Sequence, residues 1–330
     1  MSKPKVAFYW CASCGGCEEA VVDLDEQILP VVAAVDIVFW PVALDFKRAD
    51  VELLGDRELA VSFINGAVRS SEQHEMVELL RAKSQLVVAF GSCAHLGGIP
   101  GLANFWQARD LQREAYLNVP SVVNSEQTVP QEETTAPEGE LELPQLWNTV
   151  KTLDQVIEVD YYLPGCPPPV KLIGQAVQAI VSGELPERGA VLAPDIALCS
   201  ECTLRETKPE KPILTGLKRP HQVKIKPDEC LLAQGLLCLG PVTRAGCEAA
   251  CVKAAMPCTG CMGPTSQVRD FGAKALSAVA SLVDAEDEET VSEIVSQLVD
   301  PAGTFYRYSL PASLMHRSLR KDSVKEHSHG

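Results

Sequence analysis

Short apolar runs alternate with amphipathic segments along the first half of the chain. Lys5–Trp10 (KVAFYW) is a continuous apolar run, which is typical of a buried strand. Glu18–Leu29 spaces its apolar residues along one helical face and has acidic residues in its first turn. A tight loop rich in cysteine and glycine lies between the two segments. The chain is therefore predicted to begin as strand, loop and helix.

The same alternation continues as far as residue 181. Three further apolar runs are predicted strands and a fourth is a possible one: Val35–Val42, Leu59–Ile64, Leu86–Phe90 and Gln155–Tyr162. Ser71–Lys83 and Val170–Val181 have the apolar spacing of helices. Strands that alternate with helices favour a parallel sheet covered by helices on both faces. The expected fold class is therefore α/β.

The pattern is interrupted at two places. Residues 125–144 are acidic, rich in Pro and Thr and poor in apolar residues, which predicts an exposed loop or arm. Since long loops are often functional, a partner-docking arm is the alternative. After about residue 185 periodicity is lost until two helices expected within 266–299. We therefore expect two domains, residues 1–185, which include the acidic loop 125–144, and residues 186–330.

Composition narrows the classes of function. The chain has 330 residues, 46% of them hydrophobic, and a formal net charge of −15. An acidic balance argues against nucleic acid, whose phosphates require Lys and Arg. No stretch approaches the roughly 18 apolar residues of a membrane span, and the N-terminal apolar run is too short for a signal peptide. We therefore expect a cytoplasmic protein.

Thirteen cysteines are the most unusual feature of the composition. Disulfides are rare in the cytoplasm, and an odd number of cysteines cannot all pair. Thiolates are soft ligands that select zinc, copper(I) or iron–sulfur clusters. Residues 230–264 hold six of the cysteines, no Asp and one Glu. Metal or cluster binding is therefore favoured over disulfides.

A first set of cysteines follows the predicted strands, where the functional loops of a parallel sheet gather. Its members are Cys14, Cys17, Cys93 and Cys166. Neighbouring glycines allow the backbone to curl around a cubane cluster without Cβ clashes. A redox dithiol and buried apolar cysteines are the alternatives. Cys11 closes the first strand and is interpreted as a thiol of the core or of the cluster surroundings.

The remaining eight cysteines divide into two sets of four. In chain order they are Cys199, Cys202, Cys230 and Cys238, then Cys247, Cys251, Cys258 and Cys261. Two zinc sites fit the same count. Zinc modules usually carry charged residues between their ligands, whereas the residues here are apolar and glycine-rich (LLAQGLL, LGP). Such surroundings suit a cluster whose potential depends on exclusion of water.

Five segments together resemble the small subunit of cytoplasmic [NiFe]-hydrogenases, in particular the methyl-viologen-reducing, F420-non-reducing type. They are SCGGCEEAVVDLDEQIL, GSCAHLGGIPG, LPGCPPP, CLLAQGLLCLGPVTRAGCEAACVKAAMPCTGCMGP and DPAGTFYRYSLP. The resemblance covers nearly the whole chain except the acidic arm and the last few residues. The small subunit of F420-reducing hydrogenases is similar. The related subunit of respiratory complex I has adjacent cysteines at its cluster and no second cluster domain, so it fits less well.

The resemblance implies a flavodoxin-like first domain and a smaller, irregular or helical second domain with three [4Fe-4S] clusters in all. A proximal cluster would be held by Cys14, Cys17, Cys93 and Cys166. Cys247, Cys251, Cys258 and Cys261 match a medial cluster, and Cys199, Cys202, Cys230 and Cys238 match a distal one. The pairing of these eight cysteines follows their order along the chain.

The resemblance also implies a function. H2 would be oxidised at a nickel–iron centre on a separate large subunit, and this chain would carry the electrons without catalytic residues of its own. The implied acceptors are an iron–sulfur adaptor subunit and a heterodisulfide reductase-type flavoprotein complex. An F420-reducing flavoprotein and, from a different class, a zinc-stabilised binding module are the alternatives. Glu18 and Glu19 are interpreted as first-turn helix charges rather than as a proton relay.

Overall fold

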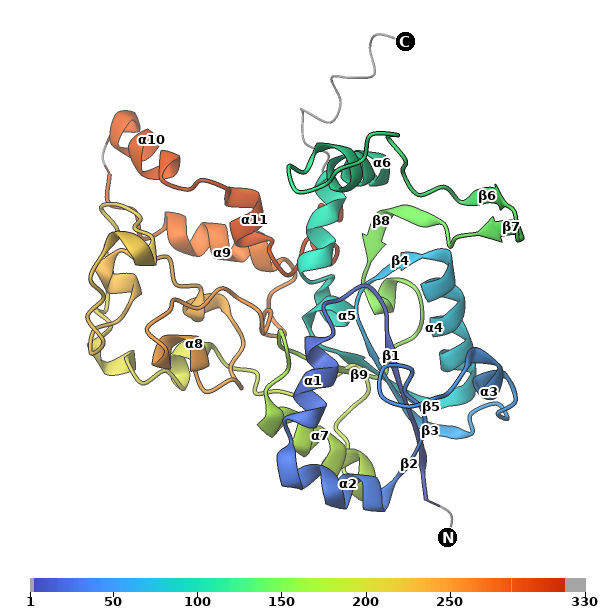
Figure 1. Cartoon of the computed structure of the whole chain (residues 1–330). Coiled ribbons are helices and arrows are strands. Elements are labelled where there is room, and N and C mark those ends of the chain that lie inside the picture. The colour runs from blue at the N-terminus through green and yellow to red at the C-terminus, as the bar shows by residue number, and fades with distance from the viewer. Residues whose placement is uncertain (1–2, 286, 318–330) are drawn as a thin grey trace.

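A parallel sheet and a cysteine-rich region with little regular structure make up the molecule (Figure 1). The structure is a computed structural model that describes residues 3–285 and 287–317. The sheet occupies most of the first half of the chain, and the cysteine-rich region lies beside its carboxyl end. The expected α/β fold class is confirmed.

The sheet has five parallel strands in the order β2-β1-β3-β5-β9. They are β1 (Lys5–Trp10), β2 (Asp36–Phe39), β3 (Leu59–Asn65), β5 (Ser84–Phe90) and β9 (Tyr161–Leu163). Numbered among themselves, these strands follow the flavodoxin-like order 2-1-3-4-5. After the last sheet helix, residues 189–193 return to the edge of β9, where the Leu192 amide donates to the Tyr162 carbonyl over 2.7 Å.

Helices cover both faces of the sheet, and each face has its own apolar core. The helices are α1 (Gly16–Val22), α2 (Ile28–Ala34) and α7 (Val170–Ser182) on one face and α3 (Arg48–Glu52) and α4 (Ser71–Lys83) on the other. Val21, Leu172 and Ile173 pack with Phe8 in the first core. Val77 and Leu80 of α4 belong to the second. Burial on both faces explains why the strands are nearly continuous apolar runs.

Two predicted elements differ from the structure. The helix predicted over Glu18–Leu29 is interrupted, since α1 ends at Val22, a 3₁₀ turn follows, and α2 begins at Ile28. This break places Pro30 in the first turn of α2, where the missing amide hydrogen is tolerated. The strand predicted over Gln155–Tyr162 is wrong for most of its length, because β9 begins only at Tyr161.

Short antiparallel strands extend the sheet side of the molecule. β4 (Val68–Ser70) pairs with β8 (Leu146–Lys151), and neither strand was predicted. The acidic arm 125–144 is exposed as expected, but it is not a structureless loop. It contains a hairpin of β6 (Glu133–Ala136) and β7 (Gly139–Glu142) that projects from the molecule (Figure 1).

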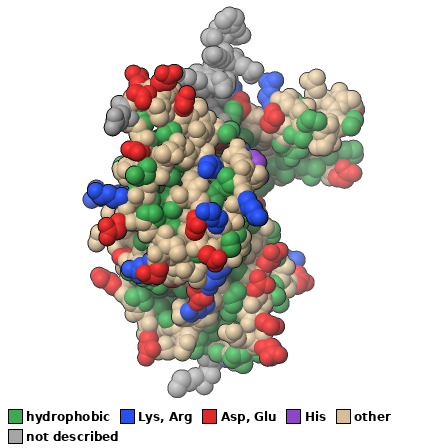
Figure 2. Space-filling view, turned by 90° about the vertical axis from the view of Figure 1, so that its left-hand side faces the viewer, with side chains coloured by type: hydrophobic (Ala, Val, Ile, Leu, Met, Phe, Trp, Pro, Cys, Tyr) green, Lys and Arg blue, Asp and Glu red, His purple; other side chains and the backbone are tan. Residues whose placement is uncertain are grey.

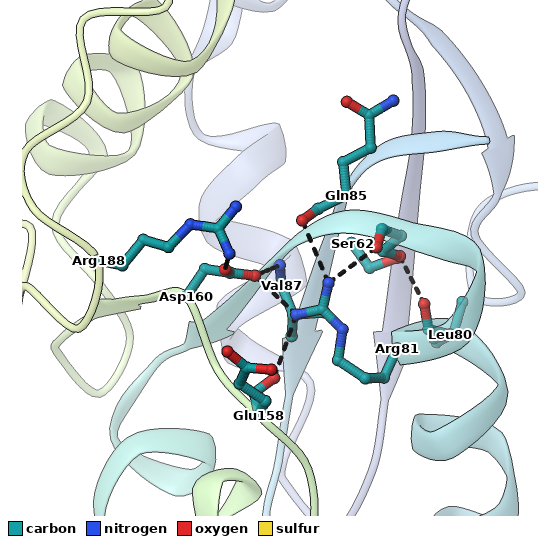
Figure 3. A network of polar contacts seen from close by, with 9 residues as sticks. Ser62, Leu80, Arg81, Gln85, Val87, Glu158, Asp160 and Arg188 are labelled. Atoms are coloured by element: carbon teal, nitrogen blue, oxygen red, sulfur yellow. Dashed lines mark hydrogen bonds and ion pairs between the residues drawn. The ribbon is translucent and has the colours of Figure 1, made fainter. Parts of the chain in front are cut away.

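A buried carboxylate joins the amino ends of β5 and β9 (Figure 3). The Asp160 side chain is fully buried and pairs with Arg81 Nη1 and with Arg188 Nη1, each over 2.7 Å. It also accepts the Val87 amide over 2.8 Å. Because a buried charge is costly unless it is paired and hydrogen-bonded, this network fixes α4 and the segment after α7 at the end of the sheet away from the cysteines.

The cysteine-rich region consists mainly of turns and short helices. Its α-helices are α8 (Ala250–Lys253), α9 (Phe271–Ala280), α10 (Glu288–Ser296) and α11 (Pro301–Phe305). α9 and α10 confirm the two helices expected within 266–299. Phe305 is buried among apolar residues of this region.

The tail, residues 306–317, then returns to the part of the molecule that contains the sheet. The Gly98 amide donates to the Tyr308 carbonyl over 3.0 Å, and Asn104 Nδ2 donates to the His316 carbonyl over 2.8 Å. Pro311 packs against Gly97 and Gly101 so closely that a Cβ on either glycine would overlap it. Within residues 3–285 and 287–317, none of the helices combines the length and apolar character needed to cross a membrane.

Candidate functional site

Three loops at the carboxyl ends of the sheet bring the first four cysteines together. Cys14 lies in the loop between β1 and α1, and Cys17 lies in the first turn of α1. Cys93 lies in the short helix α5 (Ser92–Leu96) after β5, and Cys166 follows β9. Burial raises the pKa of the Cys17 thiol far above its usual range, and repulsion from neighbouring thiols raises it further. These neighbours are Cys93, Cys166 and Cys14. Four thiolates this close require positive charge among them.

Glycines leave room for the sulfur atoms of this first set. Gly91 has a φ of +86°, and a Cβ there would overlap Cys17 Sγ. Gly98 has a φ of +58°, and a Cβ there would overlap Cys93 Sγ. Only glycine adopts a positive φ readily and also has no Cβ to collide with the sulfur atom. A cradle of this kind fits a cluster held close to the main chain.

The second set lines a single apolar cavity. Its cysteines are Cys199, Cys202, Cys230 and Cys238, and Leu198, Leu231 and Val252 are among the other lining residues. Burial raises the pKa of Cys199 to about 11, and the ammonium group of Lys208 opposes that shift. The other three thiols of the set also act on Cys199. The structure thus brings these four together as a separate group.

The third set lines a neighbouring cavity. Its cysteines are Cys247, Cys251, Cys258 and Cys261. Cys258 is 6% exposed, whereas Cys251 lies at the surface. Burial raises the pKa of Cys261 to about 12. The sequence order had grouped these four in the same way.

Direct contacts join the third set to both of the others. The Cys258 amide donates to Cys238 Sγ over 3.3 Å, which connects it to the second set. The Cys166 amide donates to Cys261 Sγ, which connects it to the first set. The Ser92 hydroxyl, next to Cys93, also donates to the Cys261 carbonyl. The third set therefore lies between the first and the second.

Zinc and iron–sulfur clusters place different demands on their cysteine ligands. Among the described residues, no three His, Cys, Asp or Glu side chains lie close enough together to bind one metal ion. A zinc site requires four ligands within about 2.0–2.3 Å of one ion. A [4Fe-4S] cluster takes four cysteines around a larger body. Four cysteines in each set match the ligand count of either kind of site.

The structure defines the environments of three residues near the first set, and for Glu18 it corrects the interpretation as a plain first-turn charge. Cys11 is buried in the core on the other face of the sheet from Cys17, so it is a core thiol. Glu18 is buried, not a simple helix charge, and accepts from Trp40 Nε1 over 3.1 Å and from Asn65 Nδ2 over 3.0 Å. His95 packs its ring on Tyr162, and its buried Nδ1 has no hydrogen-bond partner among the described residues.

Comparison with known proteins now identifies the family. Residues 14–180 match the family described as NADH ubiquinone oxidoreductase, 20 Kd subunit. The iron–sulfur subunit of the F420-non-reducing hydrogenase of Archaeoglobus profundus is 39% identical over 96% of this chain and 99% of that protein. A subunit of the F420-non-reducing hydrogenase of Methanothermobacter thermautotrophicus is 39% identical over 97% of this chain and 98% of its own length. The chain belongs to the small subunits of F420-non-reducing hydrogenases.

Membership in this hydrogenase family makes the chain a subunit of an oxidoreductase, as the resemblance implied. A chain of the [NiFeSe] hydrogenase from Desulfovibrio vulgaris Hildenborough superimposes with a TM-score of 0.51 at 16% identity, covering 80% of this chain and 94% of that one. At this low identity the likeness concerns the fold alone.

Sequence reasoning missed the surroundings of the cysteines more than the cysteines themselves. Gly98 was not singled out, although the repeated glycines of GSCAHLGGIPG were the available signal. The buried Glu18 carboxylate is hydrogen-bonded by Trp40, which follows β2, and by Asn65, the last residue of β3. No local pattern indicated that contact.

Proposed function

We propose that this chain is the electron-transfer small subunit of a cytoplasmic [NiFe]-hydrogenase and that it holds three [4Fe-4S] clusters. The observation that carries the proposal is the convergence of twelve of the thirteen cysteines in three sets of four, with the third set in contact with both others. Clusters bound there would supply one-electron transfer.

The residues of each site follow from these groups. Cys14, Cys17, Cys93 and Cys166 would hold the proximal cluster, Cys247, Cys251, Cys258 and Cys261 the medial cluster, and Cys199, Cys202, Cys230 and Cys238 the distal cluster. The first would belong to a domain of residues 1–185 and the other two to a domain of residues 186–330. Apolar residues line the cavities of the second and third sets, which favours a defined potential.

The chain's partners follow from the same proposal. H2 would react at a nickel–iron centre on a large subunit that binds this chain. Electrons would leave toward an iron–sulfur adaptor subunit and a heterodisulfide reductase-type flavoprotein complex. The names of the relatives favour this acceptor over F420, because they are described as F420-non-reducing.

Analysis of the anaerobically purified chain distinguishes clusters from zinc. We expect about twelve irons and as many acid-labile sulfides per chain, in line with four of each per cluster. A colourless protein with two or three zinc ions and no labile sulfide would instead support a zinc-stabilised binding module, and the electron-transfer role would be rejected.

Single cysteine substitutions test the assignment of ligands. In the complex with the large subunit, Cys258→Ala should remove about a third of the iron and stop H2-dependent dye reduction. Hydrogen–deuterium exchange, which needs only the partner's centre, should continue. Cys11→Ala is the matched control, since Cys11 is buried in the core outside the three sets, and it should keep all the iron. Unchanged dye reduction in the Cys258 variant would rule out the proposed path of electrons through this chain.

A further inference from the structure

A groove lined by cationic side chains lies beside cysteines of the third and second sets, the ligands proposed for the medial and distal clusters. It has a volume of about 450 Å³ and lies between the turn at Leu217–Pro220 and the segment Gln297–Arg307. Lys218, Arg219 and Arg307 line it, together with Asp300. Apolar lining residues complete its walls: Leu217, Leu237, Leu239, Met256, Pro257 and Val299.

The groove belongs to a stretch of chain whose charge is opposite to that of the whole protein. Residues 205–226 contain seven Lys or Arg and two Glu, although the protein carries a net charge of −15. Figure 2 looks onto the cysteine-rich region and shows several Lys and Arg side chains across the middle of that face. A local positive field is therefore expected on a protein that repels anions elsewhere.

Most cations of this stretch also lack a carboxylate partner. In the described part of the chain only Lys226 of the seven forms an ion pair, with Glu229. Basic residues elsewhere are commonly paired, as in Lys5–Glu58, Arg48–Glu75 and Lys171–Glu248. Lys218 and Arg219 are exposed. Their charges are thus available to another molecule.

The position of the groove relates these charges to electron transfer. Cys258, a ligand proposed for the medial cluster, is one of its lining residues. Leu237 and Leu239, which also line it, flank Cys238 of the distal set. Lys208 of the same basic stretch lines the distal cavity itself. A protein seated in the groove would therefore lie next to two of the three cysteine sets.

We propose that this groove docks an acidic surface of the protein that accepts electrons from this chain. The proposal rests on the electron-transfer function proposed above. The exposed cations would steer the acidic partner, and the apolar walls, including the exposed Met256 and Val299, would give contact area after encounter. Docking of this kind weakens as salt screens the charges.

The test uses this chain in complex with its large subunit, without the accepting subunits, so that the groove is open, with H2 as donor and two acceptors. One acceptor is an acidic [2Fe-2S] ferredoxin and the other is methyl viologen, which requires no docking. Lys218→Glu/Arg219→Glu should lower kcat/KM for the ferredoxin about tenfold or more at low salt, and the loss should shrink at high salt. Viologen reduction should stay within about twofold, because the cysteines are untouched.

A matched variant separates docking from net charge. Arg57→Glu/Lys274→Glu makes the same change of charge at exposed positions outside the groove, and ferredoxin reduction should be nearly unaffected. Equal ferredoxin rates in the groove variant and the wild type would overturn the proposal. The proposal would also be overturned if the groove variant lost viologen reduction to the same extent, or no longer bound the large subunit. The groove would then serve the cluster domain or the subunit interface. Failure of the electron-transfer function itself would show separately, as missing iron and sulfide.

Discussion

At the scale of single residues, a glycine limits where the sulfur atoms of the first cysteine set can lie. Gly91 combines a left-handed φ with a backbone that touches Cys17 Sγ. Gly91→Ala should displace that sulfur atom, so we expect loss of the proximal cluster, about a third of the iron and labile sulfide. Iron and sulfide analysis, with EPR of the reduced protein, measures the loss.

Gly183→Ala is the control for backbone strain in this experiment. Gly183 also has a left-handed φ, of +74°, but a Cβ there meets nothing within 4 Å. Its replacement should cost about 1 kcal/mol and leave the iron content unchanged. If both variants kept full iron, the contact with Cys17 Sγ would not limit cluster binding.

At the scale of elements, the sequence correctly predicted the strands and helices whose apolar pattern is complete within their own residues. The bounds of β1 and α4 agree with prediction because an apolar run and a helical stripe are complete signals in themselves. The prediction of one helix over Glu18–Leu29 is wrong. Pro30, which is tolerated only in the first turn of a helix, lies just beyond the predicted end, so the predicted segment contained no sign of the break. β4 and β8 were missed since each is short and depends on a partner distant in sequence.

The buried network at Asp160 is an element-scale feature with a measurable effect on stability. Asp160→Asn leaves Arg81 without its buried carboxylate partner, and removal of one member of such a pair costs about 3–5 kcal/mol. Differential scanning calorimetry of the whole chain should therefore show a melting temperature lower by several degrees.

Asp45→Asn is the control, because its pair with Lys47 is largely exposed and solvent screens such pairs so that they add little to stability. Equal melting temperatures for the two variants would mean that the Asp160 network is not needed to hold α4 and β9 together.

At the scale of the whole molecule, the order of the cysteines predicted which of them group together but not how the groups meet. Cys166 follows the last strand of the sheet and Cys261 lies in the cysteine-rich region, yet the amide of one donates to the sulfur of the other. Such a contact depends on how two regions pack, which no local pattern encodes. The return of the tail to Gly97 and Gly101 is of the same kind, although both glycines and Pro311 were visible in the motifs.

That return yields the last prediction, which concerns how the two regions are held together. Gly101 lies in a 3₁₀ turn without a left-handed φ, so alanine fits its backbone, but a Cβ there would overlap Pro311. Overpacking of this kind costs about 1–3 kcal/mol. Gly101→Ala should therefore release the tail and speed trypsin cleavage after Arg307 and Arg317 about tenfold. Gly174→Ala, where a Cβ makes only ordinary contact with Leu24, should leave cleavage at wild-type rates. Equal rates in all three proteins would show that the contact of Pro311 with Gly101 does not anchor the tail, and its hydrogen bonds to Gly98 and Asn104 would then be the contacts that hold it.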